Sequence, residues 1–144
     1  MAAVTAQIGN QTDASGSGVH SHSAPAGNKR TTAGLEILTC KIGIRATGTY
    51  ASGDGFTLAN ANVAIQNSRK DGRTAAIISA GFAAPGKVSG AQIGAKTVAN
   101  SGNTISGIFT QGDLSTEWAN GSMTLASFDE LVWLHVCYTL ADAS

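Results

Sequence analysis

The sequence predicts an all-β fold: a single β-sandwich or barrel, jelly-roll-like, with an extended N-terminal arm. Apolar and polar residues alternate along 35–45 and again along 131–140, and glycine-rich turns separate short apolar segments. Alternation with a period of two places successive side chains on opposite faces of a strand. Several short strands joined by such turns are typical of sandwiches and barrels. At 144 residues we expect one domain, at 35–144, after an arm at 1–34.

The clearest strand–turn–strand passage is Leu35–Leu58. One face of its first strand carries Leu38, Cys40, Ile42 and Ile44, and the other carries Thr39, Lys41, Gly43 and Arg45. The strand is expected to continue to Tyr50. Gly53-Asp54-Gly55 then supplies a turn, because glycine accepts positive φ without steric cost. A short second strand is expected at Phe56–Leu58.

The middle of the chain shows less regular patterns of apolar and polar residues. Leu58–Gln66 fits either alternation or one or two helical turns. Asp71-Gly72 indicates a hairpin turn. In the strand expected at Arg73–Ala84, we place on one face Ala76, Ile78, Ala80 and Phe82.

Further along, 92–98 and 104–110 look like a hairpin around Ser101-Gly102-Asn103. A loop that contains Trp118 follows. The last strand, Leu131–Leu140, carries bulky residues on both faces. One face has Val132, Leu134, Val136, Tyr138 and Leu140, and the other has Leu131, Trp133, His135, Cys137 and Thr139. We therefore expect it to be a central strand, or one whose outer face meets a partner.

Residues 1–34 are rich in Gly, Ser, Thr, Asn, His and Ala, and show no apolar period. Such a segment cannot by itself bury enough surface to offset its ordering entropy. We expect it to be held by a neighbouring chain; the alternative is that it folds back on its own domain.

Composition excludes several functions. Nine Lys and Arg balance nine Asp and Glu, so the formal net charge is zero and no nucleic-acid partner is expected. No stretch approaches the roughly 20 apolar residues that span a bilayer, so no membrane role is expected. Cys40 and Cys137 each lie in apolar patterns and are interpreted as small buried side chains rather than a disulfide.

No catalytic motif is complete. Gly81–Val88 departs from the phosphate-binding loop pattern where Val88 replaces the Ser or Thr that would hold Mg²⁺. His20 and His22 lack further metal ligands nearby, and His135 stands alone. We therefore predict no enzyme, no cofactor and no metal.

The remaining candidates are partner-binding residues. The basic turn near residue 70 would suit an acidic partner surface, and Trp118 would suit an interface or would close one end of its own sandwich. Together with five residues of the polar arm, they make up the candidate partner-binding residues: Val19, His20, His22, Lys29, Arg30, Arg69, Lys70, Arg73 and Trp118.

The passage Gly48–Leu58, GTYASGDGFTL, resembles a motif of small virion proteins of tailed bacteriophages, which reads roughly G-[DT]-Y-x-x-G-G-hydrophobic-x-L. Here Asp54 interrupts the glycine pair, and 131–140 looks like the family's closing strand. The resemblance implies a capsid decoration, or cement, protein on the exterior of the virion. Its expected partners are the major capsid protein and further copies of itself, as a homotrimer.

Two other classes stay open. One is a tail or fibre component of the virion. The other is a carbohydrate-binding β-sandwich that would use Trp118 or Tyr50 as a stacking platform.

Overall fold

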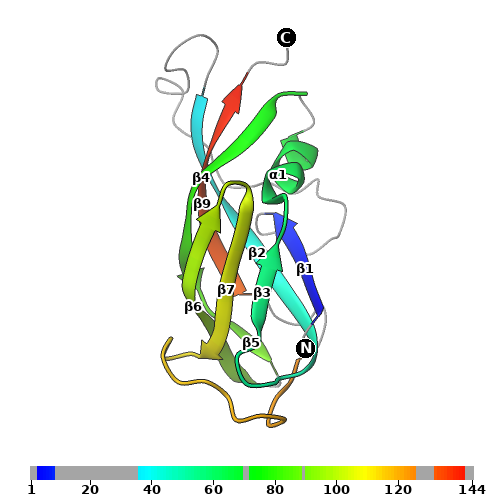
Figure 1. Cartoon of the computed structure of the whole chain (residues 1–144), viewed down its shortest axis with the longest axis vertical. Helices are drawn as coiled ribbons and strands as arrows, with labels where there is room; N and C mark the ends of the chain where they lie inside the picture. Colours follow the sequence, from blue (N-terminus) through cyan, green and yellow to red (C-terminus); the bar gives the residue numbers. More distant parts are fainter. Residues whose placement is uncertain (1–2, 9–35, 70–71, 89, 126–131, 142–144) are drawn as a thin grey trace.

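The computed structural model describes residues 3–8, 36–69, 72–88, 90–125 and 132–141, and in this part of the chain two antiparallel β-sheets pack face to face (Figure 1). This confirms the predicted all-β sandwich. The first sheet has the order β1 (Ala3–Ile8), β2 (Glu36–Thr49), β9 (Val132–Ala141), β4 (Thr74–Ala84), and β8 (Thr124–Leu125) pairs with β2. The second has the order β3 (Gly55–Leu58), β7 (Thr104–Gln111), β6 (Ala91–Ser101), β5 (Gly86–Val88).

The antiparallel pair β2–β9 lies at the centre of the first sheet, as the bulk on both faces of the last strand predicted. The side chains that alternation placed on one face point into the sandwich, where all are at most 2% exposed: Leu38, Cys40, Ile42, Ile44, Val132, Leu134, Val136, Tyr138 and Leu140. Against them pack the inner residues of the second sheet, among them Phe56, Ile105 and Phe109.

The two cysteines lie on neighbouring strands but on opposite faces of the sheet. Cys40 is opposite Val136 in the register and points into the core, whereas Cys137 is opposite Thr39 and points outward. Both cysteines are free, so no disulfide joins them. Cys137 is half-buried rather than fully buried.

The predicted hairpin is present between β6 and β7. Ser101 pairs with Thr104, which leaves a two-residue loop, Gly102-Asn103. Gly102 has φ +57 and Asn103 is not among the residues with positive φ. A positive φ at the first central position alone is the type II′ turn, which suits the twist of two antiparallel strands.

The ambiguous segment Leu58–Gln66 overlaps the helix α1 (Ala61–Arg69), which closes the upper end of the sandwich (Figure 1). Ala61 and Ile65, four residues apart, are fully buried, while Val63 is 46% exposed. Spacing by four places side chains on one helical face. The hairpin predicted at Asp71-Gly72 is therefore wrong, since this segment joins a helix to β4 rather than two strands.

The face assignment within β4 also needs correction. Ile77 is opposite Tyr138 and Ser79 is opposite Cys137, so Ile78 is an extra residue at a β-bulge. A bulge shifts the alternation by one position. Ala75 and Ile77 are buried before it, Ala80 and Phe82 pack on the core after it, and Ile78 is 49% exposed. Ala76 and Ile78 are thus not on the face of Ala80 and Phe82.

The beginning of the chain differs from the predicted arm in one respect. Residues 3–8 form β1, which pairs antiparallel with β2 of the same chain, from Ala3 opposite Thr47 to Ile8 opposite Ile42. In this segment the chain folds back on its own domain, which was the alternative to being held by a neighbouring chain. The remainder of the predicted arm, 9–34, lies outside the described residues.

Three amide side chains cover the open edge of β4. Asn103 Oδ1 accepts a hydrogen bond from the Ile77 N–H at 2.9 Å, and Gln66 Oε1 accepts one from the Ala75 N–H at 3.2 Å. Asn62 Nδ2 donates to the Ala75 carbonyl oxygen at 3.2 Å. The Asn103 carbonyl also accepts from the Ala61 N–H at 2.7 Å. We call Asn62, Gln66 and Asn103 the amide clamp; it ties α1 and the β6–β7 hairpin to the first sheet.

Replacing Asn103 by alanine tests the clamp. Asn103→Ala leaves the Ile77 N–H without its acceptor, so we expect the free energy of unfolding to fall by about 1–3 kcal/mol, measured by urea denaturation. The matched control is Asn100→Ala in the same hairpin, whose amide donates to the Gly102 carbonyl; it should cost less than about 1 kcal/mol. Equal losses in the two variants would contradict a special role for Asn103.

Candidate interaction surfaces

The outward face of the first sheet carries two of the four exposed large hydrophobic side chains among the described residues, Ile37 and Ile78. Register places its side chains in rows across β2, β9 and β4. We call this set the outer sheet face; it comprises Ile37, Thr39, Lys41, Trp133, His135, Cys137, Thr139, Ala76, Ile78 and Ser79.

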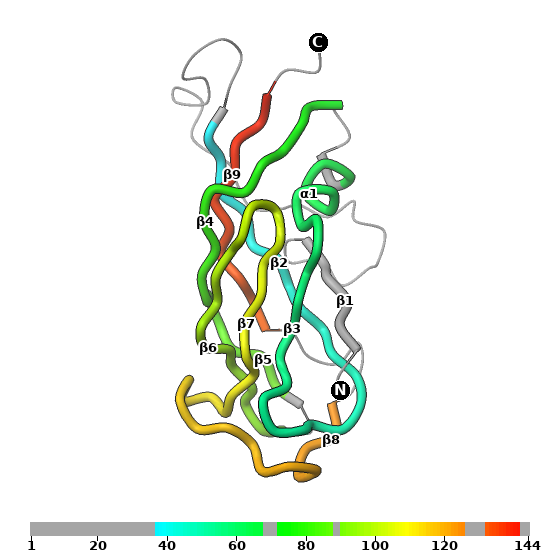
Figure 2. The backbone as a smooth tube through the Cα atoms, in the orientation of Figure 1, coloured from blue at the N-terminus to red at the C-terminus, as the bar shows by residue number. Residues whose placement is uncertain are grey.

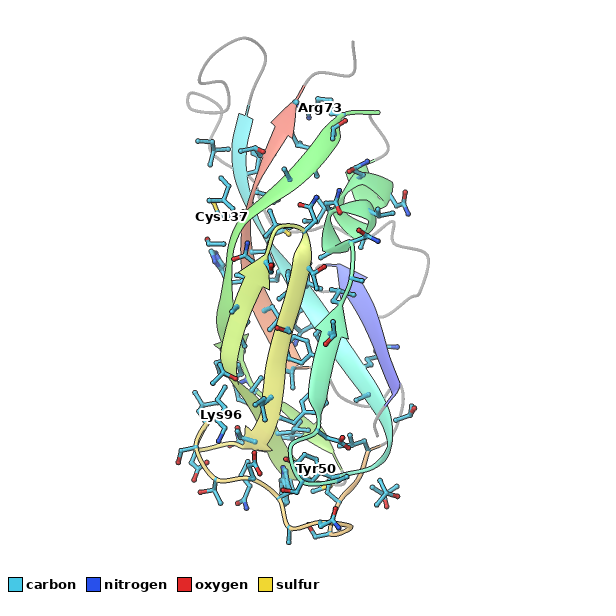
Figure 3. The ribbon with its side chains drawn as sticks, viewed as in Figure 1. Tyr50, Arg73, Lys96 and Cys137 are labelled. Atoms are coloured by element: carbon cyan, nitrogen blue, oxygen red, sulfur yellow. The ribbon has the colours of Figure 1, made fainter. Side chains whose placement is uncertain are left out.

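Two isoleucines make this face apolar. Ile37 is 41% exposed on β2, and Ile78 is 49% exposed on β4, with Cys137 and Thr139 of β9 between them. The bulge is the reason that Ile78 is exposed, because Ile78 and Ser79 both lie opposite Cys137. Figure 3 shows Cys137 beside β4 on this side of the molecule.

The outer sheet face carries little charge. In the register Lys41 lies directly opposite His135, and both side chains are exposed. Within the set these two are the basic groups, and it contains no carboxylate. Further along the same face of β2, Arg45 is buried, with 8% of its surface exposed. A surface of this kind contacts a partner through apolar area and shape, with electrostatics secondary.

A second surface lies at the lower end of the sandwich, where β2 turns into β3. Tyr50, 1% exposed, fills the core there, and its hydroxyl lies 3.5 Å from the Phe109 carbonyl oxygen. Asp54 Oδ2 accepts a hydrogen bond from the Ala51 N–H at 2.9 Å, and the Asp54 carbonyl accepts one from the Phe109 N–H at 3.0 Å. The passage Gly48–Leu58 is thus a corner between the two sheets, in which Tyr50 and Asp54 have structural roles.

The loop from Gly112 to Ser122 runs beneath this corner (Figure 2). Asp113 organises its start: Oδ1 accepts from the N–H groups of Ser115 and Thr116, and Oδ2 accepts from the Thr116 hydroxyl. These hydrogen bonds, the Thr116 hydroxyl first, lower the pKa of Asp113 from 3.8 to about 2. Lys96 Nζ donates to the Ser115 carbonyl at 3.4 Å, which ties the loop to β6.

The same loop positions Trp118 against the core. The indole ring is half-buried and packs on the core residues, so it closes the lower end of its own sandwich, one of the two predicted roles. Its Nε1 is buried and has no hydrogen-bond partner among the described residues. Nearby, burial and then the charge of Glu117 raise the pKa of Tyr50 above its ordinary value.

Among the candidate partner-binding residues that the structure describes, Arg73 and Trp118 do not come together. Arg73 lies at the upper end of the sandwich, while the Trp118 loop lies at the lower end, next to Lys96 and Tyr50 (Figure 3). Arg69 is the last residue of α1. The other six lie outside the described residues: Val19, His20, His22, Lys29, Arg30 and Lys70. Sequence reasoning missed Ile37 and Ile78 as candidates.

Across the described residues, no three His, Cys, Asp or Glu side chains gather closely enough to hold a metal ion. Among the same residues, α1 is far too short to be a candidate membrane span, and no other helix qualifies.

A scan against protein-family models, a search of the curated proteins and a search of the solved structures returned no match.

The corner predicts a strict requirement at Gly55. A Cβ there would lie 2.0 Å from the Gly107 carbonyl oxygen, a backbone atom that cannot move aside cheaply. We expect Gly55→Ala to lower the free energy of unfolding by about 3 kcal/mol or more, because overpacking displaces the backbone. Gly81→Ala is the control, since a Cβ at this strand position meets nothing within 4 Å. A Gly55→Ala protein as stable as Gly81→Ala would contradict the close approach of Gly55 to the Gly107 backbone.

The Asp113 loop predicts an acid-sensitive local structure. Because its pKa is lowered in the folded protein, the carboxylate stabilises the loop at pH values above about 4, and this contribution is lost as pH falls through about 2. Carbon NMR titration of the carboxyl group should give a midpoint near 2. Thr116→Val removes the largest cause and should raise that midpoint. A midpoint near 3.8 in the unaltered protein would refute the described hydrogen bonds.

Proposed function

We propose that this protein is a capsid decoration protein of a tailed bacteriophage. It binds the exterior of the icosahedral head as a trimer and holds adjacent copies of the major capsid protein together. The motif Gly48–Leu58 suggests the family, and the outer sheet face is the observation that carries the proposal. That face offers exposed isoleucines on a rigid sheet, where a structural partner can dock.

The docking energy comes mainly from apolar area. Each Å² of apolar surface removed from water contributes about 25 cal/mol. A full-sized interface buries about 800 Å² per partner, and a decoration protein can act with less. Copies that are linked in one oligomer bind a repeating lattice with multiplied strength, because each later contact forms at high effective concentration.

Two features of the face suit this role. Its residues sit on β2, β9 and β4, whose ladders hold them in fixed positions, so little conformational entropy is lost on docking. It presents Lys41 and His135 as its basic groups, so we expect binding to depend weakly on salt.

A tail or fibre component is the alternative, and it would use the same face between copies. The carbohydrate-binding alternative loses one of its two stacking residues, since Tyr50 is 1% exposed and cannot offer its ring to a sugar. Trp118 packs with part of its ring on the core.

Head binding tests the proposal. The purified protein would be mixed with empty heads of the phage that encodes it, and bound protein measured by co-sedimentation. Ile37→Asp and Ile78→Asp place a charge on the outer sheet face and should weaken binding at least tenfold, about 1.4 kcal/mol per contact. Val63→Asp is the matched control, because Val63 is equally exposed but lies on α1.

The oligomeric state of every variant would be determined first by light scattering. If the unaltered protein does not bind heads, the decoration proposal fails, and purified tails become the next probe. If it binds and all three variants bind equally well, the outer sheet face is not the docking surface.

A further inference from the structure

The strand β1 is an edge strand that closes one side of the sandwich. It pairs with β2 through six register positions, from Ala3–Thr47 to Ile8–Ile42. It also contacts α1 and β3, so it lies along the seam between the first sheet and the edge of the second (Figure 1).

The core requires a strand at this position. β1 is paired opposite Ile42 and Ile44, which are 0% and 1% exposed. Without it, the β2 edge and the seam beside β3 would open to water, with unpaired backbone groups next to the core. Some chain must therefore supply this strand, but the core does not specify which copy.

The connection between β1 and β2 is far longer than their pairing needs. Two antiparallel neighbours are joined by loops of about 2–5 residues, whereas 27 residues, 9–35, separate these strands. A connection of that length reaches up to about 90 Å when extended. A chain of 144 residues folds with a radius of gyration of about 15 Å, so a touching neighbour lies well within reach.

We propose that β1 is exchanged between copies, so that residues 3–8 of one chain pair with β2 of the next chain in the oligomer. This inference rests on the self-association in the proposed function and adds how the copies are joined. Exchange keeps the same register and the same contacts, because every copy presents an identical β2. The choice between the two arrangements then depends on effective concentration, which is high among chains already held in one oligomer.

Exchange would also convert a reversible contact into a durable one. Separating two copies would require the Ala3–Ile8 strand to leave its ladder and expose the seam, in addition to breaking any surface contact. A cyclic arrangement, in which each chain passes its strand to the next, uses every donated strand and leaves no β2 edge open.

Engineered cysteines distinguish exchange from pairing within one chain. Paired positions in an antiparallel ladder have Cα atoms about 4.5–5.5 Å apart, which suits a disulfide. One protein would carry Ala3→Cys and another Thr47→Cys, each with Cys137→Ser and with the buried Cys40 retained. The two would be unfolded together, refolded and oxidised. We expect a disulfide that joins the two different chains, identified by peptide mass.

Ser101→Cys in place of Thr47→Cys is the matched control, because Ser101 is exposed at the β6–β7 hairpin, away from β1. It should give no link to residue 3. The double variant Ala3→Cys/Thr47→Cys, oxidised alone, should form mostly links between chains. If these variants fail to refold, hydrogen exchange on mixed deuterated and unlabelled wild-type oligomers provides the second measurement. If β1 is exchanged, the rate at which subunits mix should not exceed the rate at which the amide hydrogen bonds of residues 3–8 open.

The outcomes separate the two proposals. A protein that is monomeric by light scattering and forms links only within a chain overturns both self-association and exchange. An oligomer whose double variant links only within each chain overturns exchange alone and leaves the proposed function standing. Links between chains in an oligomer support exchange.

Discussion

The strand β2 hydrogen-bonds to β1, β8 and β9, and the rest of the sandwich depends on these pairings. Its inner face supplies Leu38, Cys40, Ile42 and Ile44 to the core, and its end leads through the Tyr50 corner into the second sheet. Because a strand has only two faces, fixing the inner one by burial also fixes which residues face outward. The exposed position of Ile37 is therefore a consequence of the core rather than a separate feature.

The parts of the fold that the sequence predicted are those with long, regular alternation. β2 and β9 each keep a period of two over ten or more residues, and the Gly102-Asn103 turn has the residue type its backbone needs. The failures arise where that regularity is short or shifted. A single extra residue at Ile78 reverses the faces within β4, and no composition signal marks a bulge. In β1, Val4, Ala6 and Ile8 do alternate with polar residues, but six residues are too few to stand out beside a long Gly/Ser-rich segment.

Prediction of the candidate surfaces was limited for a different reason. Alternation placed Trp133, His135 and Cys137 on an outer face, and the register confirms that they share it. The basic turn and Trp118 were both plausible by residue type, yet Arg73 and the Trp118 loop lie at opposite ends of the sandwich. Residue type indicates what a side chain can do, but only the strand order indicates which side chains are neighbours.

The amide clamp has a consequence for how such a protein stays in solution. Its formal net charge is zero, so charge repulsion does little to keep copies apart. Exposed sheet edges normally invite further strands, but the N–H groups of Ala75 and Ile77 already donate to side-chain oxygens. At many sheet edges, charged lysine side chains prevent pairing with a further strand. Here Asn103 and Gln66 protect the β4 edge instead, because they occupy its N–H donors. Resistance to open-ended stacking is built into the geometry and would persist at high salt, where a charge-based defence is screened.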